Sequence, residues 1–284
     1  MILFKQIQDI QKYLHRQQQE NQKIGFIPTM GALHAGHLSL LQASKKETGI
    51  TVCSIFVNPT QFNDPKDFEK YPITINEDIL LLEKAGCDVL FLPSVEEMYP
   101  QGQTLKKEYP LGRLEQLLDG KYRPGHFQGV CQVVERLLDI IEPDLLFLGQ
   151  KDYQQCMVLR KMLEITGKNA KISLNICPTL RETSGLAMSS RNMRLSQDQR
   201  EQALAIYQTL THIKNNLTKY SFDQLIAWGE GFLSREGFAK IDYISIADAK
   251  TLEPLENNNQ NKELVCLIAA FMGDVRLIDN MILK

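Results

Sequence analysis

Residues 23–46 read KIGFIPTMGALHAGHLSLLQASKK, and this stretch decides the fold. An apolar run, KIGFIPT, leads into a turn with two glycines, and the helical spacing of apolar residues begins near Leu38. A strand, a glycine-rich turn and a helix in this order are typical of α/β folds that bind a ligand at the carboxyl end of the strand. The stretch therefore predicts a sheet and a binding site at its edge.

The alternation of strand and helix continues on the C-terminal side of this stretch. Apolar runs typical of buried strands are followed by segments with helical spacing. Because parallel strands need crossover connections, which are nearly always right-handed, the pattern predicts an α/β fold with a Rossmann-like, doubly wound parallel sheet in a domain of residues 1–180. The expected strands are 50–59, 87–93, 144–150 and 171–177, and the expected helices are 76–86, 126–143 and 153–167.

The pattern changes after Pro178, where a loop with Gly and Ser, RETSGLAMSSRNMRL (181–195), begins. Two helices with capping-box starts follow, and then three β-rich runs. These features predict a smaller α+β domain with an antiparallel sheet, residues 181–284. The capping boxes pair Ser196 with Gln199 and Ser221 with Gln224, the runs are 238–248, 263–272 and 275–283, and the polar run 256–262 is the expected hairpin loop.

Charge and composition favour a small-molecule partner. The formal net charge is −2, with Lys and Arg spread along the chain, so we expect no nucleic-acid surface. The N-terminal segment has no apolar leader run and no run approaches 18 apolar residues, so we expect no membrane span and a cytoplasmic protein. The six cysteines form no CxxC pair and lie mostly in apolar runs, as reduced core cysteines do.

The turn PTMGALHAGH (28–37) carries the sharpest chemical signal. Gly31 and Gly36 allow close approach of the backbone to a ligand, and the start of the following helix presents unpaired N–H groups to a phosphate. His34 and His37 can both donate to phosphate oxygens. Two alternatives remain for the pair alone: capping or surface histidines, or a metal site, which lacks a nearby third ligand.

Polar residues also follow two other expected strands. Asn58 and Gln61 lie in FVNPTQF (56–62), and Lys151 and Asp152 lie in GQKD (149–152), both at the carboxyl edge of the sheet. Gln61 suits a substrate with hydroxyls and a carboxylate. Lys151 suits a phosphate, and Asp152 suits a ribose hydroxyl. The alternative interpretations are a loop glutamine held to the backbone for Gln61 and a surface ion pair for Lys151 and Asp152.

These motifs resemble the His-x-Gly-His superfamily of nucleotidyltransferases and class I aminoacyl-tRNA synthetases, and within it the pantothenate synthetase family. The resemblance extends in order over essentially the whole chain. Its motifs are PTMGALHAGH (28–37), FVNPTQF (56–62), YP (71–72), RPGHF (123–127), LFLGQKDYQQ (146–155), LAMSSRN (186–192) and AAFMGDVRLIDN (269–280).

The resemblance implies a ligase that joins pantoate to β-alanine with ATP through a pantoyl adenylate, with Mg²⁺ accompanying ATP. It also implies a homodimer. Phosphoryl chemistry of this kind depends on positioning and charge stabilisation. The implied catalytic residues are His34, His37, Lys151 and Arg191, with His37 also a proton donor.

The resemblance also implies a set of binding residues. Three positions depart from the usual family wording, namely Ala35, Gln150 and Leu180. The residues implied for ATP are Met30, Gly31, Ala32, Leu33, His34, Ala35, Gly36, His37, Gly149, Gln150, Lys151, Asp152, Leu180, Met188, Ser189, Ser190 and Arg191, and those implied for pantoate and β-alanine are Asn58, Gln61 and Gln155.

Metal ligands and the final product stay open at this stage. Glu77 and Asp78 are acidic candidates for Mg²⁺, but acids at a helix start more often complement the helix dipole. A nucleotidyltransferase of the same superfamily acting on another small acceptor is the alternative enzyme, and a nucleotide-sensing module that lost the reaction is the non-enzyme alternative. A tRNA-charging enzyme would need a basic RNA surface.

Overall fold

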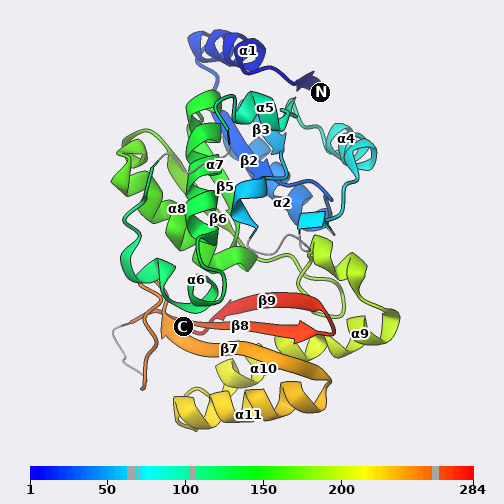
Figure 1. The fold of residues 1–284 in the computed structure, drawn as a ribbon, viewed down its shortest axis with the longest axis vertical. Coiled ribbons are helices and arrows are strands. Elements are labelled where there is room, and N and C mark those ends of the chain that lie inside the picture. Colours follow the sequence, from blue (N-terminus) through cyan, green and yellow to red (C-terminus); the bar gives the residue numbers. More distant parts are fainter. Residues whose placement is uncertain (63–67, 70, 103–106, 258–261) are drawn as a thin grey trace. The chain divides into compact units, whose positions relative to one another are not determined.

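A computed structural model describes residues 1–62, 68–69, 71–102, 107–257 and 262–284 of the chain. The chain forms two compact units, each with its own sheet (Figure 1). The first unit comprises Met1–Leu111, Arg123–Gly149 and Val158–Pro178, and the second comprises Gly112–Tyr122, Gln150–Met157 and Thr179–Lys284. The division at residue 180 stays a prediction about domains.

The first unit is built on a parallel sheet of six strands in the order β1-β4-β3-β2-β5-β6. Chain order reverses between β2 and β5, and the carboxyl ends of strands at such a reversal are where open α/β sheets bind ligands. The predicted doubly wound sheet is thereby confirmed. The strands are β1 Ile2–Phe4, β2 Ile24–Thr29, β3 Ile50–Ile55, β4 Val89–Phe91, β5 Leu145–Gly149 and β6 Ser173–Cys177.

Helices cover both faces of this sheet. Helix α2 packs on β2, β3 and β5, burying Leu40 with Ile27 and Phe147 and Leu41 with Cys53. Helix α7, green in Figure 1, packs on β2, and α1 packs on α7. The helices and short turns before residue 178 are α1 Ile7–Gln19, α2 Ala35–Glu47, η1 Pro59–Gln61, α4 Ile75–Lys84, α5 Val95–Met98, η2 Gly112–Glu115, α6 Leu118–Tyr122, α7 His126–Ile141, η3 Gln150–Asp152, α8 Tyr153–Ile165 and η4 Lys168–Ala170.

The second unit has an antiparallel sheet of three strands in the order β7-β8-β9. Helices α10 and α11 pack on one face and share a core with Leu210, Leu225, Ile246 and Ile268. The predicted α+β character is confirmed. Its elements after residue 178 are η5 Ser190–Arg194, α9 Gln197–Gln202, α10 Leu204–Asn216, α11 Phe222–Arg235, β7 Phe238–Asp248, β8 Leu264–Met272 and β9 Val275–Ile282.

Several expectations about elements can be compared with the structure. The capping boxes at Ser196 and Ser221 are present, and the six cysteines are free thiols. The expected start of α2 near Leu38 is wrong, because His34 caps the helix and α2 begins at Ala35. The short edge strand β1 was not expected, and residues 258–261 of the expected hairpin loop lie outside the described residues.

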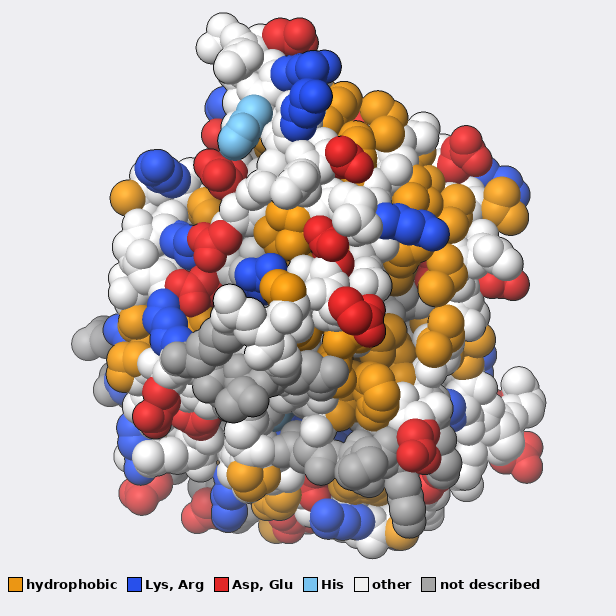
Figure 2. Space-filling view, turned by 45° about the horizontal axis from the view of Figure 1, so that its top comes forward, with side chains coloured by type: hydrophobic (Ala, Val, Ile, Leu, Met, Phe, Trp, Pro, Cys, Tyr) orange, Lys and Arg blue, Asp and Glu red, His pale blue; other side chains and the backbone are white. Residues whose placement is uncertain are grey.

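Basic and acidic side chains are mixed on the face of the molecule drawn in Figure 2, where both are interspersed with apolar side chains. Over the described parts of the chain, the structure has no helix with the length and apolar character needed to cross a membrane.

Candidate active site

The turn after β2 has an unusual backbone that a buried carboxylate holds. Gly31 and Ala32 both have left-handed backbone angles, with φ of 83° and 49°. Asp78 of α4 is 1% exposed and accepts the N–H groups of Ala32 and Leu33 at 2.9 and 2.7 Å. The hydroxyl of Thr74 also donates to Asp78, at 3.2 Å. Asp78 therefore compensates for a conformation that an alanine adopts only at a cost.

The two histidines of this turn cap α2 reciprocally. Nδ1 of His34 accepts the N–H of Gly36 at 3.1 Å, and Nδ1 of His37 accepts the N–H of His34 at 3.3 Å. The ring centroids lie 4.1 Å apart. A neutral imidazole that accepts at Nδ1 carries its proton at Nε2, so both rings can present an Nε2–H donor. The capping interpretation and the phosphate interpretation of this pair are thus compatible, since each uses a different ring nitrogen.

Asn58 and Gln61 lie after β3, as the sequence predicts for the carboxyl edge. Asn58 is 1% exposed, and its Nδ2 donates to Oε1 of Gln61 at 3.1 Å and to the carbonyl of Gly129 at 3.2 Å. Its Oδ1 accepts from the hydroxyl of Tyr99 at 2.8 Å. Burial raises the pKa of Tyr99 above its ordinary value, at which the hydroxyl is already a donor at neutral pH. In this geometry Asn58 orients Gln61, while its role as a substrate ligand stays a prediction.

Gln61 connects the second motif to the first. Its Nε2 lies 2.9 Å from Sδ of Met30, and its backbone carbonyl lies 2.7 Å from Nδ1 of His126. The other ring nitrogen of His126 lies 3.2 Å from the guanidinium of Arg123. The RPGHF motif thus supports the turn that carries Gln61. Met30 and Gln61, implied for ATP and for pantoate, are side by side in the first unit.

The predicted residues of the second unit form two groups. In the first group, η3 carries Lys151 and Asp152, whose charged atoms are 3.5 Å apart, and Gln155 follows one turn later in α8. The side chain of Lys151 is 18% exposed, whereas that of Asp152 is 49% exposed. Lys151 is thus held mostly within the protein, unlike an ordinary surface lysine.

The second group is a folded-back loop that ends in η5. The N–H of Met188 donates to the carbonyl of Leu180 at 3.1 Å, which brings these two residues implied for ATP together. Ser189 caps η5, and its hydroxyl accepts the N–H of Arg191 at 3.2 Å. Ser190 is buried at 8% exposure. The loop is therefore tied by hydrogen bonds within the second unit.

Sequence reasoning missed several residues that hold these groups. Asp78 was considered only as a metal or dipole residue, and the contact of Gly129 with Asn58 has no sequence signal that we could identify. Asp279 and Asn280 lay in a recognised motif without an assigned role. In the described ranges, no group of three or more His, Cys, Asp or Glu side chains is arranged to hold a metal ion.

Comparison with known proteins identifies the family. The family model for pantoate-beta-alanine ligase matches residues 2–282. A pantothenate synthetase of Cytophaga hutchinsonii is 44% identical over 286 positions, covering 100% of this chain and 99% of that protein. One of Leptospira biflexa is 45% identical over 286 positions with the same coverage.

Solved structures agree with this assignment. Pantothenate synthetase of Thermus thermophilus has a TM-score of 0.90 at 36% identity, with 100% of both chains covered. Pantoate-beta-alanine ligase of Francisella tularensis has a TM-score of 0.83 at 38% identity, covering 100% of this chain and 98% of that one. The sheet, the turn with His34 and His37, and these similarities together show that the chain belongs to the pantoate-beta-alanine ligase family and is a ligase that joins pantoate to β-alanine.

Proposed function

We propose that the chain joins pantoate to β-alanine with ATP through a pantoyl adenylate. The solved ligase of Francisella tularensis is described as complexed with beta-gamma ATP and β-alanine, which supports the proposal that this chain binds ATP and β-alanine. The observation that carries the proposal is the reciprocal capping of α2 by His34 and His37. Because Nδ1 of each ring accepts a backbone N–H, the ring proton of each histidine is expected on Nε2, at a helix start that follows a strand of the parallel sheet.

The reaction has two steps. A carboxylate oxygen of pantoate attacks the α-phosphorus of ATP, and the bond from that phosphorus to the bridging oxygen breaks, which releases pyrophosphate. The amine of β-alanine then attacks the acyl carbon, the bond from this carbon to the AMP oxygen breaks, and the amine loses a proton. AMP and pantothenate are the products. Negative charge grows on phosphate oxygens in the first step, so donors and cations have the most effect there.

In the first unit, we assign to the histidine pair the role of hydrogen-bond donors to ATP. His34 and His37 donate from Nε2 to phosphate oxygens, and His37 also supplies a proton as the leaving group departs. The left-handed turn at Gly31 and Ala32 lets the backbone approach ATP. Gln61 holds pantoate by its amide, and Asn58 keeps that amide in one orientation.

In the second unit, we assign to Lys151 and Arg191 the role of cations that bind phosphate. Both neutralise charge on the departing pyrophosphate, with Ser189 and Ser190 as hydroxyl donors. Asp152 accepts from the ribose, Leu180 and Met188 contact the adenine, and Gln155 contacts pantoate. A burial of about four-fifths of the Lys151 side chain supports a ligand role, because a partly desolvated ammonium interacts strongly with phosphate.

Mg²⁺ is proposed as a companion of the ATP phosphates, without a site made of protein ligands. Asp78 does not fit as a direct ligand, since its two oxygens accept two backbone N–H groups and a hydroxyl. Glu77 is exposed and alone offers a single carboxylate. The cation supplies charge neutralisation on the phosphates, and no residue role above depends on it.

A homodimer and a cytoplasmic location complete the proposal. The family resemblance supports the homodimer, and light scattering on the purified chain would measure its mass. Six free cysteines and a dependence on ATP suit a reducing compartment.

The test is product formation by purified protein with ATP, Mg²⁺ and pantoate, with and without β-alanine. We expect AMP and pantothenate only when both substrates are present. His37→Ala is expected to lower kcat about 10²- to 10³-fold, as loss of one transition-state donor does. His15→Ala is the matched control, because His15 lies on α1 with its side chain 57% exposed and is expected to behave as wild type.

Two results would contradict the proposal. ADP and inorganic phosphate in place of AMP would exclude adenylation. A His37→Ala variant as active as His15→Ala would exclude the assigned donor role while leaving the ligase activity in place.

A further inference from the structure

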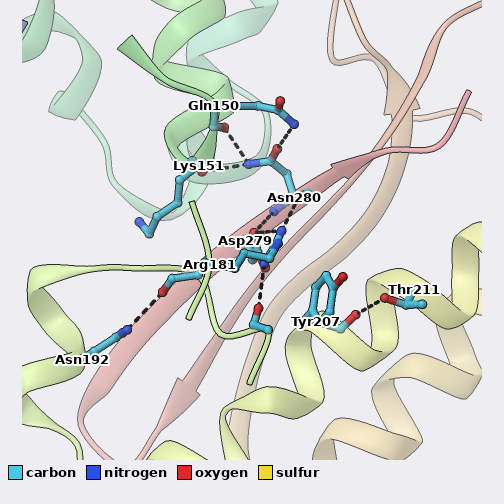
Figure 3. Close-up of polar contacts among 10 residues, drawn as sticks. Gln150, Lys151, Arg181, Asn192, Tyr207, Thr211, Asp279 and Asn280 are labelled. Carbon is cyan, nitrogen blue, oxygen red and sulfur yellow. Dashed lines mark hydrogen bonds and ion pairs between the residues drawn. The ribbon is translucent and has the colours of Figure 1, made fainter. Parts of the chain in front are cut away.

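Two adjacent residues of β9, Asp279 and Asn280, are buried polar groups that the roles above do not use. They are 4% and 2% exposed. Successive side chains on a strand point to opposite faces of the sheet. A polar pair at these positions can therefore hold one segment on each face, which an apolar pair cannot do (Figure 3).

Asn280 holds the segment that carries Lys151. Its Nδ2 donates to the backbone carbonyls of Gln150 and Lys151 at 2.9 and 2.8 Å, and its Oδ1 accepts from the side chain of Gln150 at 3.2 Å. Because the two carbonyls flank the Cα of Lys151, these bonds fix the direction in which its side chain leaves the backbone. Figure 3 shows the amide of Asn280 directed at this segment.

Asp279 holds the loop that leads to Ser189 and Arg191. Its carboxylate pairs with both terminal nitrogens of Arg181, at 2.5 and 3.0 Å, and the guanidinium stacks over the ring of Tyr207 with 4.4 Å to the ring centroid. Arg181 also donates to the carbonyl of Gly185 at 3.2 Å. A bidentate pair fixes the orientation of the guanidinium as well as its position.

The anchored loop continues without a break to the Ser and Arg residues. Asn192 donates from Nδ2 to the carbonyl of Ala187 at 3.0 Å, and the N–H of Met188 donates to Leu180. Burial raises the pKa of Asp279, while Arg181 and Lys151 oppose that rise, so the carboxylate interacts with cations of both segments. The two anchors also meet directly, since the N–H of Asn280 donates to Asp279 at 2.8 Å.

We propose that Asp279 and Asn280 are positioning residues for the adenylation step, which set the Lys151 segment and the Ser189–Arg191 loop in their ATP-binding arrangement. The inference rests on the proposed roles of Lys151 and Arg191. Neither residue is assigned contact with a substrate. Because negative charge on the departing pyrophosphate develops only in the first step, loss of this anchoring slows adenylation more than the attack by β-alanine.

Rapid-mixing kinetics on the full-length chain tests this separation. Enzyme is first mixed with ATP and pantoate to measure adenylation, and β-alanine is then added to the preformed adenylate to measure the second step. Asn280→Ala and Asp279→Asn are each expected to slow adenylation about 10²-fold, the effect of misplacing a group by about 1 Å, and to slow the second step much less. Lys214→Met is the matched control, since Lys214 donates to the carbonyl of Ile282 on the same strand.

Backbone hydrogen exchange tests the anchoring without reference to activity. Asn280→Ala is expected to speed exchange in residues 150–155, and Asp279→Asn in residues 180–192, with Lys214→Met changing neither. Unaltered exchange in both variants, or an equal slowing of both chemical steps, would overturn the inference. Wild-type protein that forms no AMP at all would instead contradict the proposed function. Hydrogen exchange would then still show whether Asp279 and Asn280 hold the two segments.

Discussion

His34 and His37 each use Nδ1 to cap a helix, and the proposed function gives a chemical role to the other ring nitrogen. Nδ1 of each ring accepts a backbone N–H at the start of α2, which leaves Nε2 as the protonated nitrogen. A residue that only capped the helix would be replaceable by Ser or Asp, which are better caps. The proposed donor role of Nε2 would account for histidine at both positions.

A prediction at this scale concerns Asp78. Asp78→Ala is expected to lower the free energy of unfolding by about 3 kcal/mol or more, since hydrogen bonds to a buried charged group contribute about 1.5–3 kcal/mol each and two backbone donors and the hydroxyl of Thr74 lose their partner. Urea unfolding would measure the change. Glu77→Ala is the control, because Glu77 is the exposed neighbour on the same helix, and it should lie within about 0.5 kcal/mol of wild type. Equal effects of the two substitutions would contradict the role given to Asp78.

The signal for Asp78 in the sequence was incomplete. The acidic residue at a helix start was visible, but periodicity cannot tell whether it faces solvent, a metal or another turn. Its partners Ala32 and Leu33 are more than 40 residues away along the chain. Long-range contacts of this kind depend on the packing of α4 in a cluster with Leu33, Ile55 and Leu90, which only the folded chain provides.

At the scale of elements, α7 lies close to the turn that carries Gln61. A Cβ atom on Gly129 would lie 2.4 Å from the carbonyl oxygen of Thr60 and 3.0 Å from Cα of Gln61. The absence of a side chain lets the helix touch η1 and lets its carbonyl accept from Asn58. The order of strands and helices could be predicted from periodicity, whereas this close contact could not, because glycine within a helix has several explanations.

Gly129→Ala is therefore expected to destabilise the chain by about 1–3 kcal/mol, as overpacking does, and to raise the KM for pantoate by displacing Gln61. Gly231→Ala in α11 is the matched control. Apart from the helix's own backbone and the two neighbouring residues, no atom of the described residues lies within 4 Å of a Cβ placed there, so the better helix propensity of alanine should stabilise by up to about 1 kcal/mol. Thermal unfolding measures the stability of both variants, and steady-state kinetics measures their KM for pantoate. Similar unfolding temperatures and pantoate KM values for the two variants would contradict the packing argument.

At the scale of the whole molecule, each unit has its own core and its own sheet. The sequence predicted a parallel sheet followed by an antiparallel one, because the apolar runs, helical spacing and capping boxes are local signals. It did not predict that residues 112–122 and 150–157 belong to the second unit. Tyr243 and Arg276 of the β7-β8-β9 sheet contact Asp119, a pairing that no local pattern encodes.

Burial of the thiols gives a prediction for the intact molecule. Five of the six cysteines are at most 3% exposed, and Cys177 is the half-buried one. Burial raises the pKa of Cys87 to about 11, and burial with the nearby Glu47 raises that of Cys177. A thiol reagent at pH 8 is therefore expected to label one cysteine slowly in the native protein and all six after unfolding. The rate should rise with pH, because the thiolate is the reacting form.

Cys177→Ser is the control for this experiment and should abolish the native reaction. Rapid native labelling of several thiols would show that the cores of the units open readily, which contradicts the burial described here.

The measurement that tests the central claim most directly follows a heavy oxygen isotope from the carboxylate of pantoate. Purified chain is given labelled pantoate, ATP, Mg²⁺ and β-alanine, and the products are analysed by mass spectrometry. Attack on the α-phosphorus predicts one heavy oxygen in AMP and one in pantothenate. Label in inorganic phosphate with ADP as the nucleotide product, or AMP without label, would contradict adenylation as the route to pantothenate.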